Sequence, residues 1–577
     1  MSTVTREAGR RLLRYKGRLA AAIVTLLGST AATLAGPFLV GYGIDHAILQ
    51  HRAHVLDVIA AVLMGTVVIG FVLGKAQINL VGGLGERFCY DLRQEVFAHL
   101  QGLSLDFYDS ERTGRLVTRM TADFDALQAL VQQGLIILVT NILLFAGATV
   151  TLLVLSWQLF LVCLVIAPVL VWATRRFQRD SRLAYERVRE TIGQTLVTVQ
   201  EGLTGVRVIQ AFAREDSQVR RFASHNEAQL EANIDAVRVS IRFFPIIELS
   251  AVVTTAAIAG VGGLFVDHRV VPLGIVATFV LYMNSLFDPV QQMSQLFNQF
   301  QSSGAAFGKL LGILATEPTV VEAAAPVELP AGGDMMLEGV TFSYGTGSAV
   351  LEGVDLVVKR GEKLALVGPT GAGKSTLAKL MARLYDPTTG RIRFGGVDLR
   401  DASFESLRSR VVMVPQEGFL FRGTILDNVR IGRLDASDDE AAAALDAIGA
   451  RDRFEQMEGG LGAVVEARGS TLSAGERQLV SLARAALANP DVLILDEATS
   501  SLDPGTEAEV DAAMRTVSHG RTTIVIAHRL QTAAEADRIA VVSGGGISEI
   551  GTHDDLLDRH GHYAALFAIW DDAGRTD

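Results

Sequence analysis

The segment from Gly368 to Thr376 has residue types and a spacing suited to holding the phosphates of a nucleotide. It fits the pattern G-x-x-x-x-G-K-[ST] and follows an apolar run, Leu364 to Val367, that is typical of a strand. Glycines let backbone N–H groups face phosphate oxygens, Lys374 supplies a cation, and the Ser375 hydroxyl can ligate Mg²⁺. A glycine-rich turn formed for packing alone is the alternative. The residues expected around the phosphates are Gly368, Pro369, Thr370, Gly371, Ala372, Gly373, Lys374, Ser375 and Thr376.

A second apolar run, Val492 to Leu495, ends in two adjacent acids, Asp496 and Glu497. Asp496 is placed to support Mg²⁺, directly or through water, and Glu497 to polarise an attacking water. Adjacent carboxylates repel each other without a cation, an objection that bound Mg²⁺ removes. A pair of acids after a strand also serves as a helix N-cap. The presence of Lys374 in the same part of the chain favours the metal interpretation.

Length and composition indicate several domains, some of them in a lipid bilayer. A chain of 577 residues is expected to form more than one domain. Its hydrophobic fraction of 49% and mean hydropathy of +0.32 are high for a wholly soluble protein. The net charge of -11 argues against a nucleic-acid partner. Cys89 and Cys163 are the only two cysteines and have no Cys or His at ligand spacing, so neither a disulfide framework nor a zinc site is expected.

Six long apolar stretches in the N-terminal part predict membrane-spanning helices. Crossing a bilayer takes about 20 apolar residues in a helix, and most of the stretches approach that length. The fourth and sixth are shorter and also fit a buried core helix, but a series of six favours spanning. The stretches are Leu19 to Val40, Val55 to Leu73, Leu135 to Leu155, Leu159 to Ala173, Ile246 to Val266 and Val271 to Leu286.

The distribution of basic residues predicts a cytoplasmic N-terminus. Six Arg and Lys residues lie between positions 6 and 18, whereas the first outer loop, residues 41–54, carries only Arg52. The Arg-rich connections 82–133 and 175–245 then also lie inside. A secretory signal peptide is the alternative, but the first stretch is too long and further spans follow. We therefore expect a multi-pass protein of the plasma (inner) membrane, in contact with its lipids.

The two inner connections are rich in helix formers, so the spanning helices are expected to continue into the cytoplasm. Short breaks occur at residues 104–109 and at residues 202–205. Aromatic side chains on short exposed helices can fill a groove on a partner domain. Phe107, Tyr108 and Phe212 are therefore candidate anchors, and packing against neighbouring helices is an equally open interpretation.

A change of composition between Glu317 and Gly333, where prolines and glycines gather, indicates a linker. We divide the chain into a transmembrane domain (1–316), a linker (317–335) and a soluble domain (336–577). Strands alternating with helices predict an α/β domain on a largely parallel sheet, with ligands at the carboxyl ends of the strands. The predicted strands are Val340 to Ser343, Leu364 to Val367, Arg391 to Phe394, Val411 to Val414, Val492 to Leu495, Thr523 to Ala527 and Arg538 to Val542.

In this order of parts the chain resembles an ATP-binding-cassette (ABC) half-transporter of the exporter type. That family fuses an all-α transmembrane domain of six helices to an α/β P-loop ATPase domain. The resemblance covers nearly all of the sequence. Its most specific element is Leu472-Ser-Ala-Gly-Glu-Arg-Gln478, which is similar to the family signature and stands shortly before Asp496.

The resemblance implies roles for residues whose patterns are weak in isolation. Tyr344 matches the aromatic that stacks on adenine, Gln416 the glutamine that senses Mg²⁺ and the docking helices, and His528 the histidine that contacts the γ-phosphate. Ser501-Leu502-Asp503 match a loop at the dimer seam. The implied catalytic residues are Glu497, His528 and Gln416, and the implied Mg²⁺ ligands are Ser375, Gln416 and Asp496.

The resemblance also implies a dimer. In the family the signature serine and glycine, here Ser473 and Gly475, complete the ATP site of the opposite protomer. Two chains would thus enclose two ATP molecules, and the second chain is either another copy or a homologous half-transporter. ATP favours the closed pair because its γ-phosphate bridges the two domains, and hydrolysis removes the bridge. Closure would turn the spanning helices from inward-facing to outward-facing.

Three positions depart from the family pattern. Ala474 stands where glycine is usual, Glu476 where glutamine is usual, and Ala467 where glutamate is usual ahead of Arg468. A methyl group and a negative charge near a phosphate site are expected to lower turnover. The coupling role of the usual glutamate is not carried over to Ala467. These departures are compatible with a heterodimer.

The substrate is defined only as a small or amphipathic molecule, such as a drug, a lipid or a peptide. Lys75 and Glu248 lie within predicted spans, near ~28 Å depth at ~1.5 Å per helical residue. They are a candidate ion pair or gate at the cytoplasmic mouth, and snorkelling to the interface is the alternative. ATP-driven export is the favoured function. An importer on the same fold, or an ATP-regulated membrane subunit that does not transport, are the alternatives.

Overall fold

The structure, a computed structural model of the chain, describes residues 7, 10–11, 13–345, 347–416, 418–496, 504–527 and 529–574. It divides into two compact units. The first contains Met1–Gln101 and Gly114–Ala315, and the second contains Gly102–Thr113 and Thr316–Asp577. The short segment Gly102–Thr113 therefore belongs to the second unit, although it lies between two spans in the sequence.

The first unit is helical, and six segments in its described part are long and apolar enough to cross a membrane. The six predicted spans are thereby confirmed. Several helices run well beyond the apolar stretches, as the sequence predicts. The helices are α2 (Lys16–Gly43), α3 (Ala53–Gly102), α5 (Thr113–Thr118), α6 (Phe124–Ala129), α7 (Leu135–Leu155), α8 (Trp157–Val165), α9 (Ala167–Thr204), α10 (Val206–Ala211), α11 (Glu215–Asp267) and α12 (Leu273–Leu314).

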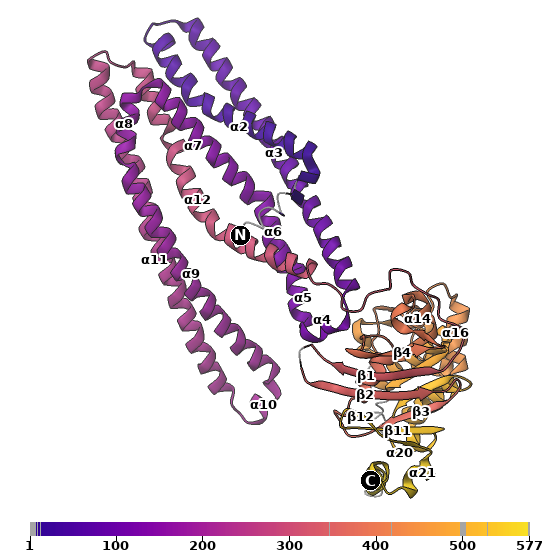
Figure 1. The fold of residues 1–577 in the computed structure, drawn as a ribbon. Helices are drawn as coiled ribbons and strands as arrows, with labels where there is room; N and C mark the ends of the chain where they lie inside the picture. The colour runs from indigo at the N-terminus through magenta and orange to yellow at the C-terminus, as the bar shows by residue number, and fades with distance from the viewer. Residues whose placement is uncertain are drawn as a thin grey trace. The chain divides into compact units, whose positions relative to one another are not determined.

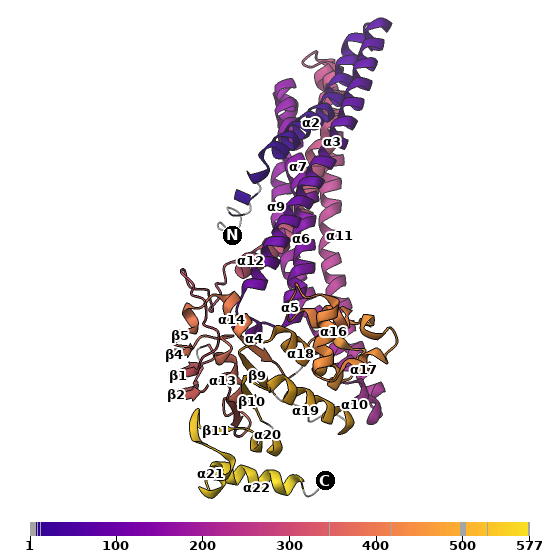
Figure 2. The same cartoon turned by 90° about the vertical axis from the view of Figure 1, so that its right-hand side faces the viewer.

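Helix α12 is held to its neighbours by polar contacts in an otherwise apolar interior. The Tyr282 hydroxyl donates to the Leu34 carbonyl of α2, and the Asn141 amide of α7 donates to Gln292 Oε1 at 3.0 Å. Helices α9 and α11 run side by side, joined by α10 (Figures 1 and 2). Phe177 and Phe243 stack between them with centroids 4.1 Å apart. Hydrogen bonds such as those of Tyr282 and Asn141 matter in a bilayer, because lipid tails pack against apolar helix surface as well as another helix does.

Lys75 in α3 and Glu248 in α11 do not pair with each other. Both side chains are exposed, and neither has an ion-pair partner among the residues that the structure describes. The hypothesis of an ion pair within one chain is therefore not supported. Their exposure agrees with the snorkelling alternative.

The second unit is built on two larger sheets and a two-stranded ribbon. The six-stranded sheet has the order β12-β11-β3-β10-β9-β6, and all its neighbours are parallel except β11 and β12. The four-stranded sheet has the order β2-β1-β4-β5 and is antiparallel. The strands are β1 (Met335–Ser343), β2 (Ala349–Val358), β3 (Lys363–Val367), β4 (Thr389–Phe394), β5 (Val397–Asp398), β6 (Val411–Val414), β7 (Gly423–Thr424), β8 (Val464–Val465), β9 (Val492–Asp496), β10 (Thr522–Ile526), β11 (Arg538–Ser543) and β12 (Gly546–Gly551).

Helices cover the six-stranded sheet and form a separate group beyond β6. Figure 2 shows α16, α17 and α18 gathered at one side of this unit, with β1, β2, β4 and β5 at the other. The helices are α4 (Leu105–Ser110), α13 (Lys374–Met381), α14 (Phe404–Arg410), α15 (Ile425–Arg430), α16 (Asp438–Ala447), α17 (Arg451–Glu455), α18 (Ala474–Ala488), α19 (Pro504–Ser518), α20 (Leu530–Ala534), α21 (His553–Asp558) and α22 (His562–Gly574).

The prediction of one largely parallel sheet is correct for the central strands and wrong for two others. The predicted strands at Val340 to Ser343 and Arg391 to Phe394 belong to the antiparallel sheet, and β2 and β12 were not predicted. In β3 and β10 nearly every residue is buried, as in strands covered on both faces, whereas burial alternates along β1. Short apolar runs do not distinguish these environments, because only the partner strand decides them.

The close approach of α2 and α12 at Gly41 provides a test of this packing. A Cβ at Gly41 would lie 1.8 Å from Thr278 Oγ1 and 2.4 Å from the Gly274 carbonyl oxygen. We expect Gly41→Ala to lower the unfolding free energy by about 1–3 kcal/mol, because backbone blocks relief of the clash. The measurement is the thermal midpoint of the purified protein in detergent. Gly36→Ala is the matched control in the same helix, since nothing lies within 4 Å of its Cβ position. Equal midpoints for the two variants would contradict the packing described.

Candidate nucleotide-binding site

Four parallel strands end at one edge of the sheet and bring the predicted site residues together. Ile526 in β10 is the register partner of Leu366 in β3 and of Asp496 in β9. Val414 in β6 pairs with Leu495, so Gln416 follows at the same edge. The glycine-rich loop leaves this edge directly after β3. The pairing therefore places the phosphate loop, Asp496 and Gln416 at neighbouring strand ends.

The loop between β3 and α13 adopts backbone conformations that require glycine. Gly371 and Gly373 have φ angles of +82° and +104°, and Gly373 is the N-cap of α13. A Cβ at Gly368 would lie 2.2 Å from the Val542 carbonyl oxygen of β11. Pro369, Thr370 and Gly371 are exposed. A loop of this shape leads into a helix N-terminus, where N–H groups and the helix dipole favour a bound anion.

Lys374 begins α13 and lies folded over the loop. Its ammonium donates to the carbonyl oxygens of Gly368 at 2.7 Å and Pro369 at 3.0 Å. The residue is 6% exposed, and burial lowers the pKa of its ammonium, against an opposing effect of Asp496. A partly desolvated cation beside exposed N–H groups is a strong attractor for phosphate, because a nearby anion restores the solvation that burial removes.

The predicted metal ligands fit Mg²⁺ in their chemistry. Ser375 and Gln416 are exposed, and Asp496 is half-buried. Hydroxyl, amide and carboxylate oxygens are hard donors, and Mg²⁺ is commonly held by one or two carboxylates together with substrate phosphates. No group of three or more His, Cys, Asp or Glu residues among the described residues is arranged to hold a metal.

Tyr344 follows β1 and lies beside the beginning of α13. Its hydroxyl shares a hydrogen bond of 3.0 Å with Thr376 Oγ1, and 37% of the residue is exposed. Phe342 and Tyr385 pack against its ring in T-shaped geometry, at centroid distances of 4.9 and 5.4 Å. An aromatic ring that is fixed on one side and exposed on the other suits stacking of a base.

The signature segment forms the N-terminus of α18 with a reciprocal capping box. Ser473 Oγ accepts from the Glu476 N–H at 3.2 Å, and Glu476 Oε2 accepts from the Ser473 N–H at 2.8 Å. Arg453 of α17 donates to the other Glu476 oxygen at 3.2 Å. The Glu476 side chain thus bonds to the N-terminus of its own helix, and the Arg453 guanidinium balances its charge. Gly475 is buried within the first turn.

Arg453 is a supporting residue that the sequence analysis missed. It also donates to Glu509 Oε2 at 2.8 Å and to Thr506 Oγ1 at 3.3 Å, both in α19. It therefore joins the signature helix to α19. Its position, more than 20 residues from Glu476 in the sequence, carries no local signal of this contact.

Ala467, which stands where the family usually has glutamate, lies in a tight turn. Residues Ala467–Gly469 form a 3₁₀ turn in which Arg468 has a φ of +64°. The Arg468 N–H donates to the Leu420 carbonyl at 3.0 Å, which holds this conformation. No coupling role is expected of Ala467 from the resemblance, and the structure adds none.

Glu497, His528 and the segment Ser501-Leu502-Asp503 lie outside the described residues. Their roles therefore stay predictions. Arg529, which follows His528 in the sequence, forms ion pairs with Glu507 and with Asp511, the latter at 3.8 Å. Burial raises the pKa of the Asp511 carboxyl, and Arg529 opposes that effect. Arg529 was not predicted, and its position directly after His528 is the signal that could have identified it.

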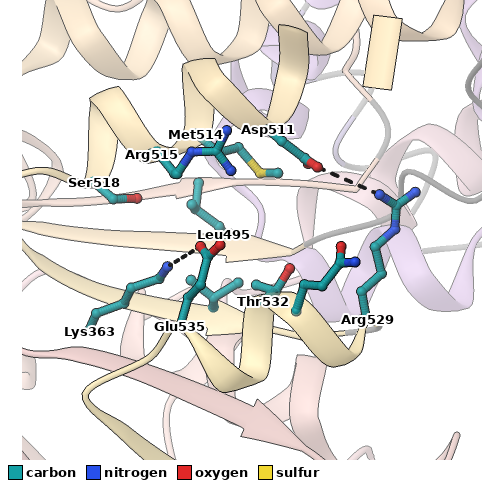
Figure 3. Close-up of a pocket in the computed structure, with 11 residues that line it drawn as sticks. Lys363, Leu495, Asp511, Met514, Arg515, Ser518, Arg529, Thr532 and Glu535 are labelled. Atoms are coloured by element: carbon teal, nitrogen blue, oxygen red, sulfur yellow. Dashed lines mark ion pairs between the residues drawn. The ribbon is translucent and has the colours of Figure 1, made fainter. Parts of the chain in front are cut away.

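A small polar cavity lies behind this ion pair, between α19, α20 and the sheet (Figure 3). Its volume is about 50 Å³. On the side away from Arg529, Lys363 Nζ and Glu535 Oε2 lie 3.7 Å apart (Figure 3). A cavity of this size holds one or two water molecules and no nucleotide. The cavity is part of the packing between α19, α20 and the sheet.

Comparison with known proteins agrees with this architecture. Residues 19–290 match the family described as ABC transporter transmembrane region, and residues 351–500 match the family described as ABC transporter. The Bacillus subtilis ABC transporter ATP-binding protein YknV is 35% identical over 96% of this chain and 93% of its own length. The ATP-dependent lipid A-core flippase of Syntrophus aciditrophicus is 32% identical over 97% of this chain and 94% of its own length.

Two further relatives extend the comparison. The multidrug efflux ATP-binding/permease protein Rv0194 of Mycobacterium tuberculosis is 36% identical over 97% of this chain, which spans 47% of that longer protein. The solved structure of a bacterial Atm1-family ABC exporter with ATP bound superposes with a TM-score of 0.81 at 28% identity, covering 96% of this chain and 98% of the other. This chain therefore belongs to the ABC transporter family, as a half-transporter of the exporter type with an ATPase domain and a membrane-spanning region in one polypeptide.

Proposed function

We propose that this chain exports a small or amphipathic substrate across the plasma (inner) membrane by alternating access, as a dimer with a second copy or a homologous half-transporter. The chain is a multi-pass membrane protein with an ATPase domain that is coupled to transport. The register that joins Leu366, Ile526 and Asp496 at one sheet edge is the observation that carries the proposal. The support it gives is that the phosphate loop lies beside Asp496, the acid that we propose holds Mg²⁺.

Within one chain the residues divide the work of hydrolysis. Lys374 and the N–H groups of the loop hold the β- and γ-phosphates, and the exposed face of Tyr344 stacks on adenine. Glu497 accepts the proton of the attacking water, while His528 and Gln416 orient the γ-phosphate and the water. Mg²⁺ held by Ser375, Asp496 and Gln416 would neutralise charge on the phosphate oxygens.

The signature segment acts on the nucleotide of the other chain. Ser473 Oγ accepts a bond from the Glu476 N–H, and its own proton serves to donate to a phosphate oxygen. The positive end of α18 points its first N–H groups at the same anion. Hydrolysis therefore requires closure of two domains, and loss of the γ-phosphate weakens that closure.

An apolar cavity in the first unit supports an amphipathic substrate. It measures about 600 Å³ and is lined by α7, α8, α9 and α12. The apolar part of the lining includes Phe145, Phe160 and Leu286. The polar part includes Arg175 and Gln178. Ligand sites of this kind are mostly apolar with a few polar groups that set orientation. The names of two relatives, a multidrug efflux protein and a lipid A-core flippase, agree with this substrate class.

The proposed base provides the first test of this function. We expect Glu497→Gln to lower ATP hydrolysis by about 10²- to 10⁴-fold, because general base catalysis contributes that range. ATP binding should persist, since the amide keeps the shape of the side chain. The measurements are phosphate release, retention of labelled ATP, and substrate movement in inside-out vesicles. Glu405→Gln, at an exposed acid of α14, is the control and should hydrolyse normally. Normal hydrolysis and transport by Glu497→Gln would refute the assignment.

The capping box provides a second test, at Glu476. Glu476→Ala removes the acceptor for the Ser473 N–H and should lower the unfolding free energy by about 1 kcal/mol. Glu476→Gln keeps that acceptor and should leave stability unchanged. We also expect ATP turnover of Glu476→Gln to stay within about threefold of the parent, because Arg453 already balances the charge of Glu476 in this partly buried pair. The readouts are thermal midpoint and ATPase rate. A large gain in turnover would show that the charge itself acts on the phosphate.

A further inference from the structure

Three aromatic rings, Phe342, Tyr344 and Tyr385, form an aromatic cluster beside the phosphate loop. Tyr344 and Tyr385 meet edge to face at 5.4 Å with an interplanar angle of 87°, and Phe342 contacts both rings. Tyr385 is 4% exposed, whereas Tyr344 is 37% exposed. The cluster therefore presents one ring to a base and buries another. Contacts of this geometry couple ring orientations, because a rotation of one ring displaces the edge of the next.

The buried ring is bound to α4. The Tyr385 hydroxyl donates to the Asp109 carboxylate near the end of α4, and both residues belong to the second unit. The Lys379 ammonium lies 5.8 Å from the centroid of the same ring. Burial raises the pKa of the Tyr385 hydroxyl, and Asp109 raises it further, so the hydroxyl stays a donor at physiological pH. A bond from a neutral donor to a carboxylate is among the stronger hydrogen bonds in proteins.

The turn that carries Tyr385 holds the other end of α4 as well. Arg383 is 2% exposed, has a φ of +46°, and donates to the Val321 carbonyl at 2.8 Å. The adjacent Val320 N–H donates to Ser104 Oγ at 2.9 Å, and Ser104 immediately precedes α4. The turn after the phosphate-loop helix thus contacts α4 directly through Tyr385 and indirectly through the linker.

We propose that Tyr385 is a positioning residue that links stacking of a base on Tyr344 to the orientation of α4 in the same chain. The proposal rests on the proposed function, which assigns base stacking to Tyr344. A stacked base fixes the Tyr344 ring, the edge contact fixes Tyr385, and the hydroxyl of Tyr385 fixes Asp109. Helix α4 stands between α3 and α5 in the sequence, so the chain connects it directly to two helices of the first unit. Phosphates alone provide no ring to stack on Tyr344, and they act on the cluster through the Thr376 bond to the Tyr344 hydroxyl rather than through stacking.

The test follows the mobility of α4 with a spin label in the full-length dimer. The label is attached to Ser110→Cys, an exposed position, in a background where the two buried cysteines are alanine. The probes are MgATP and magnesium tripolyphosphate, which has no base, each at saturating concentration in the Glu497→Gln protein. We expect MgATP to change the mobility and tripolyphosphate to change it much less. Tyr385→Phe should shrink the MgATP effect by about fivefold while ATP affinity changes little, the scale of a typical coupling between sites.

Matched variants separate this role from a merely structural one. Tyr563→Phe removes the hydroxyl of another buried tyrosine, which bonds His553 Nδ1 at 2.7 Å, and should retain the full MgATP effect. Asp109→Asn should resemble Tyr385→Phe, with no added loss in the double variant, whereas Asp106→Asn on the same helix should not. An equal response to tripolyphosphate, or an intact response in Tyr385→Phe, overturns the inference alone. Failure of the parent protein to retain MgATP overturns the proposed function together with it.

Discussion

A triphosphate carries several negative charges, and a protein can hold it only with N–H groups and cations that are in place before it binds. The parallel pairing of β3, β10 and β9 meets this requirement, because it aligns Leu366, Ile526 and Asp496 at one edge. Gly368 fits only because its missing Cβ leaves room for the Val542 carbonyl. Lys374 then lies buried over the same loop. Each of these features fails if the strand register slips by one residue.

Helix α19 is tied both to the signature helix α18 and to the residues that follow β10. Arg453 ties it to the signature helix through Thr506, Glu509 and the Glu476 carboxylate. Arg529 ties it to the end of β10. The same helix follows the segment that the family places at the dimer seam. A displacement of α19 would therefore reach both the signature helix and the residues that follow β10.

The first unit follows a different physical rule, because lipid gives no hydrophobic drive to bring helices together. Its contacts rely on small residues and on buried polar bonds. Gly41 and Gly274 allow close approach of α2 and α12, and Asn141 bonds Gln292. Phe212, one of the predicted anchors, is 73% exposed in this unit. Packing against neighbouring helices is thus not its role in one chain, and docking on a partner stays a prediction.

The sequence alone determined the spans, the phosphate loop and the family, because these depend on contiguous patterns: runs of apolar residues, fixed glycine spacing and the signature Leu472 to Gln478. It also placed Tyr344 and Gln416 through the resemblance. Tertiary structure decided which strands share a sheet, that Glu476 caps its own helix and pairs with Arg453, and that Tyr385 bonds Asp109. Tyr385 and Asp109 stand 276 residues apart. No local pattern encodes such a pair, because the contact exists only after sheets and helices have packed.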